Sequence, residues 1–351
     1  MTVVVKVDPA RPNWDDVSTA AECLRRGGLV AFPTETVYGL GVHAMNHTAV
    51  RRLFEAKERP ATDPLIVHVS ALDQVAPLVV TLHGHAGPLA ARFWPGPLTL
   101  VMRRAPSVSL EVTAGLDTVA VRVPAHPVAR ALLLAASLPV AAPSANLFSR
   151  PSPTLAEHVL DDLNGRIDMV VDAGPTPVGV ESTVLDLTVD PPTVLRPGAI
   201  SLESLRAVVP SVRLSAFQTT TSRHTAMASP GLLSKHYAPR APMTIYRGER
   251  AAVGMAICAA ARAAAAAGLR VGVLATTADV PMLSAVPVVI AELGSEHNVK
   301  VIAARLYAAL RKLDAAQVDM ILARDVSREE GLWRAVRDRL RRAAARVTVI
   351  G

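Results

Sequence analysis

The chain has 351 residues, of which 50% are hydrophobic, and it contains 27 prolines and 20 glycines. This composition excludes a chain that is disordered in bulk, and the length leaves room for two ordinary domains. The two cysteines, Cys23 and Cys258, lie far apart in the sequence, which argues against a zinc site and favours a reducing compartment.

The formal net charge of +7 is unevenly distributed along the chain. Residues 1–205 carry 16 Lys and Arg against 20 Asp and Glu, a net −4, whereas residues 206–351 carry 21 against 10, a net +11. Much of the excess lies in SREEGLWRAVRDRLRRAAARV, which favours a solvated helix face, with an RNA-facing surface as the alternative. A phosphate site in the acidic first part must therefore use a few individually placed cations.

The N-terminal stretch MTVVVKVDPARPNW does not have the basic and then apolar layout of a signal peptide. No uncharged apolar stretch is long enough to span a bilayer, because Arg262 and Gly268 interrupt the alanine-rich run. We therefore expect a soluble, cytoplasmic protein.

In chain order, the first part alternates strand-like and helical patterns. Helices are indicated at 48–59 and 127–137, and strands at 27–34, 64–70, 98–104, 118–123, 138–143, 168–174 and 182–189. We predict an α/β domain over residues 1–205, followed by a long linker over residues 206–241.

From residue 242 a second α/β unit is expected. Strands are indicated at 243–248, 270–280, 286–295 and 318–326, with an alanine-rich helix after the first, a periodic helix at 299–313, and a basic helix at the end. The alternation predicts a parallel, Rossmann-like sheet over residues 242–351. No G-x-G-x-x-G opens either unit, which disfavours a dinucleotide site.

The sequence contains no Walker phosphate loop, no kinase catalytic loop, no G-x-S-x-G elbow and no H-E-x-x-H. Instead, polar clusters stand at the expected strand ends, where α/β sheets bind ligands. They are PTETVYGLG at 33–41, KERP at 57–60, PSAN at 143–146, VEST at 180–183 and LRPG at 195–198. Taken alone, each cluster is typical of an ordinary turn or helix end and does not by itself indicate a ligand site. Together their cations and hydroxyls suit an anionic, polyphosphate-like ligand.

Seven segments, taken in order, resemble the YrdC-type domain of threonylcarbamoyl-AMP synthases. They are AFPTETVYGLG, AKERPATDPLIVHV, FWPGPLT, AGLDTVAVRVPAHP, AAPSANLFSRPSPT, VGVESTVLDL and LRPGAI. The stretch SPGLLSKHYAPR followed by an α/β unit is similar to the long, two-domain form of that family. The resemblance implies a twisted open sheet with flanking helices in the first domain. It also implies that L-threonine, bicarbonate and ATP are converted into threonylcarbamoyl-AMP and pyrophosphate, for threonylcarbamoyladenosine in tRNA.

The resemblance also implies two groups of site residues. Those on the L-threonine side are Thr36, His68, Arg122, Ala142 through its backbone, and Ser182. Those on the ATP side are Arg59, Asp63, Thr118, Ser144, Asn146, Ser152, Arg196 and Tyr237, with Lys57 and Arg59 as the catalytic cations. Magnesium would be held mainly by the ATP phosphates and water, without a protein metal site. The implied partners are a downstream tRNA threonylcarbamoyl transferase and, more weakly, tRNA itself.

Two other functions compete with the synthase. A non-catalytic RNA-binding module would suit the basic second half but needs no threonine-sized pocket. A carbamoyltransferase of the hydrogenase-maturation type contains a related domain, but two cysteines cannot build its zinc fingers.

The linker ends in SPGLLSKHYAPRAP, where Pro and Gly are typical of a connector. A passive spacer has no use for the basic and aromatic residues Lys235, His236, Tyr237 and Arg240 in its middle. The resemblance to the two-domain synthases favours a segment that closes over the first domain's crevice as a lid, with Tyr237 at the nucleotide. A spacer whose charges keep it soluble is the alternative.

Overall fold

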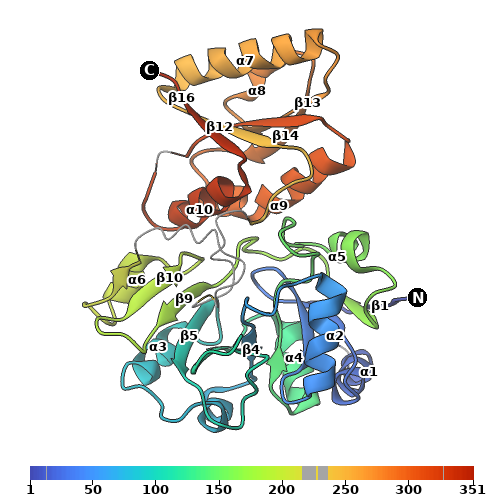
Figure 1. Ribbon diagram of the computed structural model, residues 1–351, viewed down its shortest axis with the longest axis vertical. Helices are drawn as coiled ribbons and strands as arrows, with labels where there is room; N and C mark the ends of the chain where they lie inside the picture. Colours follow the sequence, from blue (N-terminus) through green and yellow to red (C-terminus); the bar gives the residue numbers. More distant parts are fainter. Residues whose placement is uncertain (13, 216–226, 228–235, 327) are drawn as a thin grey trace. The chain divides into compact units, whose positions relative to one another are not determined.

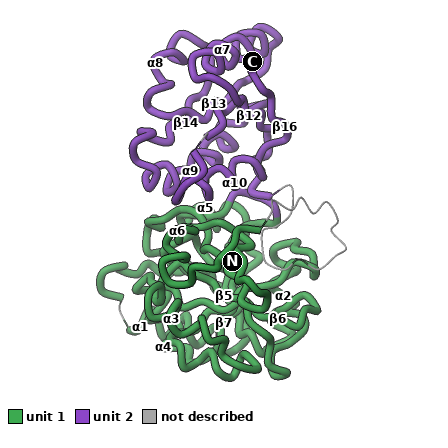
Figure 2. The backbone as a smooth tube through the Cα atoms, turned by 90° about the vertical axis from the view of Figure 1, so that its left-hand side faces the viewer, with its two compact units in different colours: residues 1–148, 152–234 green, residues 149–151, 235–351 purple. Residues whose placement is uncertain are grey.

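The computed structural model describes residues 1–12, 14–215, 227, 236–326 and 328–351. The chain divides into two compact units, one of residues 1–148 and 152–234 and the other of residues 149–151 and 235–351 (Figure 2). The first unit continues past residue 205, because β11 (Arg213–Leu214) pairs in parallel with β10 (Thr193–Arg196). Most of the expected linker, including Lys235, lies outside the described residues.

The first unit is built on a mixed sheet of 11 strands in the order β1-β8-β2-β3-β7-β4-β6-β5-β9-β10-β11 (Figure 1). The strands not yet given are β1 (Val3–Lys6), β2 (Val30–Pro33), β3 (Tyr38–His43), β4 (Ile66–His68), β5 (Leu98–Arg103), β6 (Thr118–Arg122), β7 (Val140–Ala141), β8 (Met169–Asp172) and β9 (Thr183–Asp186). The sequence patterns predicted the seven strands from β2 to β9 other than β3. They missed β1, β3, β10 and β11, of which β3 lies inside the cluster interpreted as a turn.

Helices pack on both faces of this sheet at β8, β2 and β7, and on one face at β4, β6 and β5. They are α1 (Trp14–Arg25), α2 (His47–Lys57), η1 (Leu72–Leu78), α3 (Ala86–Phe93), α4 (Pro127–Ala136), α5 (Ala156–Leu163) and α6 (Leu202–Arg206). The start of α2 follows from Asn46, whose side chain accepts a hydrogen bond from the Ala49 amide. Its end follows from Glu58, which adopts a left-handed conformation with φ of 54°.

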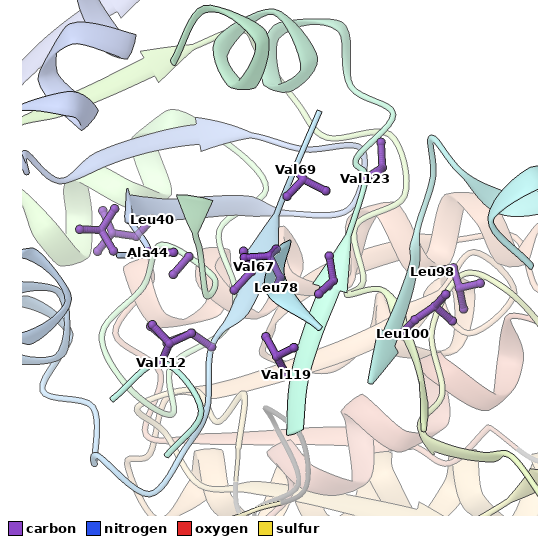
Figure 3. Packing of buried hydrophobic residues seen from close by; sticks show 14 of the residues in the cluster. Leu40, Ala44, Val67, Val69, Leu78, Leu98, Leu100, Val112, Val119 and Val123 are labelled. Atoms are coloured by element: carbon purple, nitrogen blue, oxygen red, sulfur yellow. The ribbon is translucent and has the colours of Figure 1, made fainter. Parts of the chain in front are cut away.

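The period-2 alternation of each strand distributes its side chains between two cores. Val30 and Phe32 of β2 pack with α1 and α4, whereas Ala31 between them packs with the larger cluster on the opposite face. That larger cluster includes residues of α2, α3 and α5 and the inner face of β4, β6 and β5, some of which Figure 3 shows. Because both faces are buried, these strands read as nearly continuous apolar runs in the sequence.

The second unit is a parallel sheet between two layers of helices (Figure 1). Its strand order is β14-β13-β15-β12-β16, and each neighbouring pair is parallel. The strands are β12 (Met243–Arg247), β13 (Val271–Thr276), β14 (Val288–Gly294), β15 (Met320–Arg324) and β16 (Arg346–Val349), and the helices are α7 (Arg250–Ala266), α8 (Val280–Leu283), α9 (Val299–Ala315) and α10 (Trp333–Ala343). The α/β prediction for both units is confirmed.

Candidate active site

One face of β4, β6, β5 and β9 carries four of the polar residues singled out in the sequence: His68, Thr118, Arg122 and, directly before β9, Ser182. Residues on this face alternate with core residues: His68 follows the core residue Val67, and Arg122 follows Val121. The apolar side chains on the same face are Ile66, Val101, Ala120 and Val184, with the partly buried Leu195 beside them. None of these five belongs to a helix, so this half of the sheet presents a small apolar floor edged by polar groups.

Arg122, at the carboxyl end of β6, is held by three neighbours. Its Nη2 lies 2.6 Å from Oε1 of Glu35, its Nη1 donates to the Thr36 hydroxyl over 3.0 Å, and its Nε donates to the Gly96 carbonyl over 3.2 Å. Oε2 of Glu35 accepts in turn from the Ala125 amide over 3.0 Å. Both charged side chains are buried, with 4% and 9% exposure, so the guanidinium is fixed in direction and suits a planar carboxylate ligand.

His68 lies beside Arg122, since the two residues are register partners in β4 and β6. Its Nδ1 is 3.2 Å from the Ile66 carbonyl, an arrangement that assigns the N–H to this nitrogen. Burial, followed by the charge of Arg122, lowers the pKa of His68 to about 3. The imidazole is therefore neutral at physiological pH.

This shift in pKa predicts an acid-sensitive stability. The unfolded chain binds a proton at His68 below about pH 6.5 and the folded chain does not, so stability falls as pH falls, by about 1.4 kcal/mol per pH unit. Between pH 7 and pH 5, His68→Asn should therefore lose about 2 kcal/mol less unfolding free energy than the parent protein. Urea unfolding at both pH values measures this, with the exposed His297→Asn as control. Equal losses in parent and His68→Asn would contradict the assignment.

Ser182, expected on the threonine side, contacts Arg196, which is expected on the nucleotide side. Its hydroxyl lies 2.8 Å from that of the buried Thr99, and it accepts from Nη2 of Arg196 over 3.1 Å. Nε of Arg196 also donates to the Ser182 carbonyl over 3.2 Å. The two sequence clusters VEST and LRPG are thus brought into direct contact, because β9 and β10 are antiparallel neighbours.

Lys57, the last residue of α2, is fully buried and bonded to the PSAN turn. Its Nζ donates to the Ser144 carbonyl over 2.6 Å and also to the Asn146 carbonyl. Burial and the nearby charge of Arg59 lower the pKa of Lys57 well below its usual value. Both the ammonium and the neutral amine have enough N–H groups for these two bonds. Lys57 therefore connects the end of α2 to the turn that carries Ser144 and Asn146.

Arg59 and Asp63 form a compact buried pair after α2. Nη2 of Arg59 lies 3.0 Å from Oδ2 of Asp63 and donates to the Pro64 carbonyl over 2.8 Å, and Nε donates to the Asp63 carbonyl over 3.1 Å. Thr118 begins β6 and is only partly buried. Because Ile66 pairs with Ala120 in parallel register, Thr118 lies beside the Pro64 end of β4.

The site therefore follows the strands instead of lying only beyond their carboxyl ends. Thr118 and Arg122 are on one face of β6, four residues and so about 13 Å apart. Ala142 lies between the two ends, with its amide donating to the Ile66 carbonyl over 2.9 Å. The sequence predicts a ligand crevice only at the carboxyl ends of the strands, whereas the expected site residues extend along them. Because β7 runs antiparallel to β4, the residues that follow it, from Ala142 to Ser144, lie toward the opposite end of β4.

Two carboxylates at the site were not assigned a role from the sequence. Glu35 orients Arg122, and Glu181 accepts a 2.6 Å hydrogen bond from the hydroxyl of Ser152, itself an expected ATP-side residue. Both carboxylates lie inside polar clusters identified in the sequence, Glu35 in PTET and Glu181 in VEST, so these clusters could have indicated them as site residues. Nothing in the sequence indicates Thr99, because LTLVMR is a typical strand sequence.

Tyr237 belongs to the second unit, whereas the other expected site residues belong to the first. Its ring lies 5.6 Å from that of Tyr307 and 4.1 Å from that of His236, and the Arg339 guanidinium lies 5.2 Å from its centroid. Its backbone is left-handed, with φ of 61°. The aromatic cluster of the linker is therefore packed and ordered by residues of α9 and α10.

Comparisons with known proteins cover both units. The family model described as "Telomere recombination" (Sua5, YciO and YrdC) matches residues 22–198, and "Threonylcarbamoyl-AMP synthase, C-terminal domain" matches residues 200–345. Among curated proteins, a threonylcarbamoyl-AMP synthase of Pyrococcus abyssi is 44% identical, covering 98% of each chain. One of Bacillus subtilis is 43% identical, covering 96% of this chain and 95% of the relative.

A solved structure, that of P. abyssi Sua5 complexed with L-threonine, aligns with a TM-score of 0.92. It is 42% identical and the alignment covers 100% of both chains. Fold and site together thus define a two-unit α/β enzyme with a YrdC-type first domain. The chain belongs to the threonylcarbamoyl-AMP synthase family, in the two-domain Sua5 form. No helix among the described residues is long and apolar enough to cross a membrane.

Proposed function

We propose that this protein is an L-threonylcarbamoyladenylate synthase, a nucleotidyltransferase. It condenses L-threonine, bicarbonate or CO₂, and ATP into threonylcarbamoyl-AMP and pyrophosphate for the threonylcarbamoyladenosine modification of tRNA. The observation that carries the proposal is the set of buried polar and charged groups at β4, at β6 and after α2, in a chain that matches synthases over nearly its full length. This set includes the oriented guanidinium of Arg122 and the buried cations Lys57 and Arg59.

The chemistry needs no protein nucleophile. The threonine amine adds to CO₂ to give a carbamate with release of a proton, and a carbamate oxygen then attacks the α-phosphorus of ATP. The bond from the α-phosphorus to the bridging oxygen breaks, and pyrophosphate leaves. The protein contributes by holding the reactants in line and by stabilising charge on the phosphates.

On the threonine side, Arg122 would pair with the substrate carboxylate, and Thr36 and Ser182 would supply hydroxyls around it. The neutral His68 and the backbone at Ala142 would complete the pocket over the apolar floor. The L-threonine complex of P. abyssi Sua5, which aligns along the whole chain, supports this assignment. Glu35 would act on threonine only through Arg122.

On the nucleotide side, the binding groups would come from the ends of α2, β4, β7 and β10. They are Lys57, Arg59, Asp63, Thr118, Ser144, Asn146, Ser152 and Arg196, with Tyr237 contributed by the second unit. Lys57 and Arg59 would act on the phosphates directly or by positioning the turn at 144–146. The contact between Ser182 and Arg196 would link threonine and nucleotide binding.

Magnesium fits this site as an ion carried by the nucleotide. The nearby Asp63 is buried and paired with Arg59, and no group of three or more metal-ligating side chains occurs within the described ranges. Hydroxyls and cations of the site would contact the phosphates of an ATP–magnesium complex. The ion supplies charge neutralisation of the phosphates when bound.

The proposed setting is the cytoplasm, where a tRNA threonylcarbamoyl transferase would receive the product. The segment around Tyr237 would serve as the lid over the site, excluding water from the mixed anhydride and opening to release it. Within the second unit, the packing of the Tyr237 ring on that of Tyr307 gives this part of the segment a defined position.

The direct test is pyrophosphate release with each component omitted in turn. We expect release to require L-threonine, bicarbonate, ATP and a divalent metal together, because the attacking group is the carbamate of threonine. L-threonine amide should be a poor substrate, because it lacks the carboxylate that would pair with Arg122. Equal release without threonine would identify a plain ATPase instead.

A further inference from the structure

The carboxyl edge of the second unit's sheet carries two clusters of charged side chains. The first is a balanced quartet of Arg250, Arg324, Asp279 and Glu296, in which each arginine pairs with both carboxylates. Two positive and two negative groups cancel. This quartet is sufficient to fasten β13, β14 and β15 to the start of α7, and it needs no ligand.

The second cluster is not balanced. Asp325, directly after β15, is met by three arginines: Nε of Arg247 at 2.9 Å, Nη2 of Arg341 at 3.5 Å and Nε of Arg337 at 3.9 Å. Asp325 is almost fully buried, with 4% side-chain exposure, whereas Arg247 and Arg341 are 44% and 28% exposed. One buried carboxylate thus gathers three guanidinium groups, two of them on partly exposed side chains and the third, that of Arg337, on a side chain with 14% exposure.

The other negative group at this cluster does not remove the excess. Glu329 pairs with Arg337, but its own side chain is 70% exposed, so solvent screens its charge. The positive groups also act on one another: burial, followed by the charges of Arg341 and Arg247, lowers the pKa of Arg337. Arg337 and Arg341 are one helical turn apart on α10 and share a face, so the crowding is built into the helix.

We propose that Arg247, Arg337 and Arg341 form a binding site for a phosphate group at the carboxyl edge of the second unit's sheet. Ligands of open α/β sheets bind outside the carboxyl ends of the strands. A guanidinium presents two parallel N–H groups that match a phosphate, and three of them around one carboxylate leave a net positive surface for it. This site is separate from the residues assigned to the synthase reaction.

Two sources could supply the phosphate: the backbone of an RNA, or a free compound such as pyrophosphate. The excess of basic residues after residue 205 and the partial exposure of Arg247 and Arg341 suit either. The experiment therefore has one arm for each source. Full-length protein is used in both.

In the RNA arm, fluorescein-labelled unmodified tRNA is titrated with protein at several KCl concentrations and followed by anisotropy. Arg247→Gln and Arg341→Gln should each weaken binding about 3–10-fold and lower the slope of log affinity against log salt by about 1. Arg341→Lys should retain most of the slope, because it retains the charge. Arg250→Gln, from the balanced quartet, is the matched control and should bind like the parent protein.

In the free-phosphate arm, inorganic pyrophosphate is titrated by calorimetry, and the same variants are compared with the parent in affinity and stoichiometry. Thermal melting establishes that each variant is folded, and the lysine variants replace any glutamine variant that is not. A loss in the RNA arm identifies RNA as the source, and a loss in the pyrophosphate arm alone identifies a free phosphate compound. If neither probe distinguishes Arg341→Gln and Arg247→Gln from Arg250→Gln, the proposal is overturned. Pyrophosphate release by the parent protein tests the synthase independently of either result.

Discussion

Arg122→Ala is expected to raise the L-threonine concentration needed for half-maximal pyrophosphate release by about 10²–10⁴-fold, with a much smaller effect on ATP affinity. Two charge-assisted hydrogen bonds to a carboxylate are together worth about 3–6 kcal/mol, which corresponds to that range. Arg122 is already aimed by Glu35, Thr36 and Gly96, so the parent site loses no entropy in orienting it. Calorimetric titrations with each substrate separate the two affinities.

The Arg122→Ala substitution also removes the ion-pair partner of Glu35, so the controls test for this second effect. Truncating Arg122 leaves Glu35 as a buried, uncompensated charge, which costs stability by about 3–5 kcal/mol. The double variant Arg122→Ala/Glu35→Gln removes that charge and should fold better while still binding threonine poorly. Arg103→Ala, at an exposed end of the neighbouring strand β5, should behave like the parent. Loss of ATP affinity with threonine affinity intact would reverse the proposed roles.

Lys57→Met is expected to reduce turnover by about 10²–10³-fold, the usual consequence of losing one preorganised electrostatic contact at a reacting centre. Methionine keeps the apolar stem but leaves the Ser144 and Asn146 carbonyls without their donor. The turn that carries two expected ATP-side residues should then relax. We therefore expect a higher KM for ATP together with the lower kcat, measured by pyrophosphate release under saturating threonine.

Arg51→Met is the matched control, because it removes a cation from the same helix at an exposed position. Lys57→Arg separates charge from geometry, since the guanidinium is too large for the fully buried site. A Lys57→Met protein with normal kcat and normal KM for ATP would show that the PSAN turn keeps its geometry unaided. Lys57 would then have no part in the reaction.

The fold was largely predictable because both units bury their strands on both faces. The central parts of runs such as LTLVMRR and VDMILARDV are nearly continuously apolar, and the helices between them have clear 3.6-residue periodicity. Edge strands lack this signal: three of the four positions of β1 are exposed and the fourth is only partly buried, and this strand was missed. β3 was missed because its glycines and its position in a polar cluster are typical of a turn.

The sequence predicted which residues make up the candidate site, but not which of them contact one another. The resemblance to threonylcarbamoyl-AMP synthases identified Arg122 and Ser182, yet nothing in the sequence pairs Glu35 with Arg122 across 87 positions of chain, or Thr99 with Ser182. Such pairs depend on strand order, which a single sequence does not reveal. The assignment of individual residues to threonine and ATP stays a prediction, as do the boundaries of the lid.

Residues 149–151 belong to the second unit, while Asn146 and Ser152 on either side belong to the first. Within the second unit, the Arg311 guanidinium donates to the Pro151 carbonyl over 2.6 Å, Arg150 pairs with Asp314 at 3.0 Å, and the Ala238 amide donates to the Ser149 carbonyl over 2.8 Å.

The chain thus passes between the units three times, not once. Deleting everything after the first unit would remove Arg311, Asp314 and Ala238, which are the partners of this three-residue segment. The segment stands in the chain between two expected ATP-side residues, Asn146 and Ser152, yet its contacts are those of the second unit.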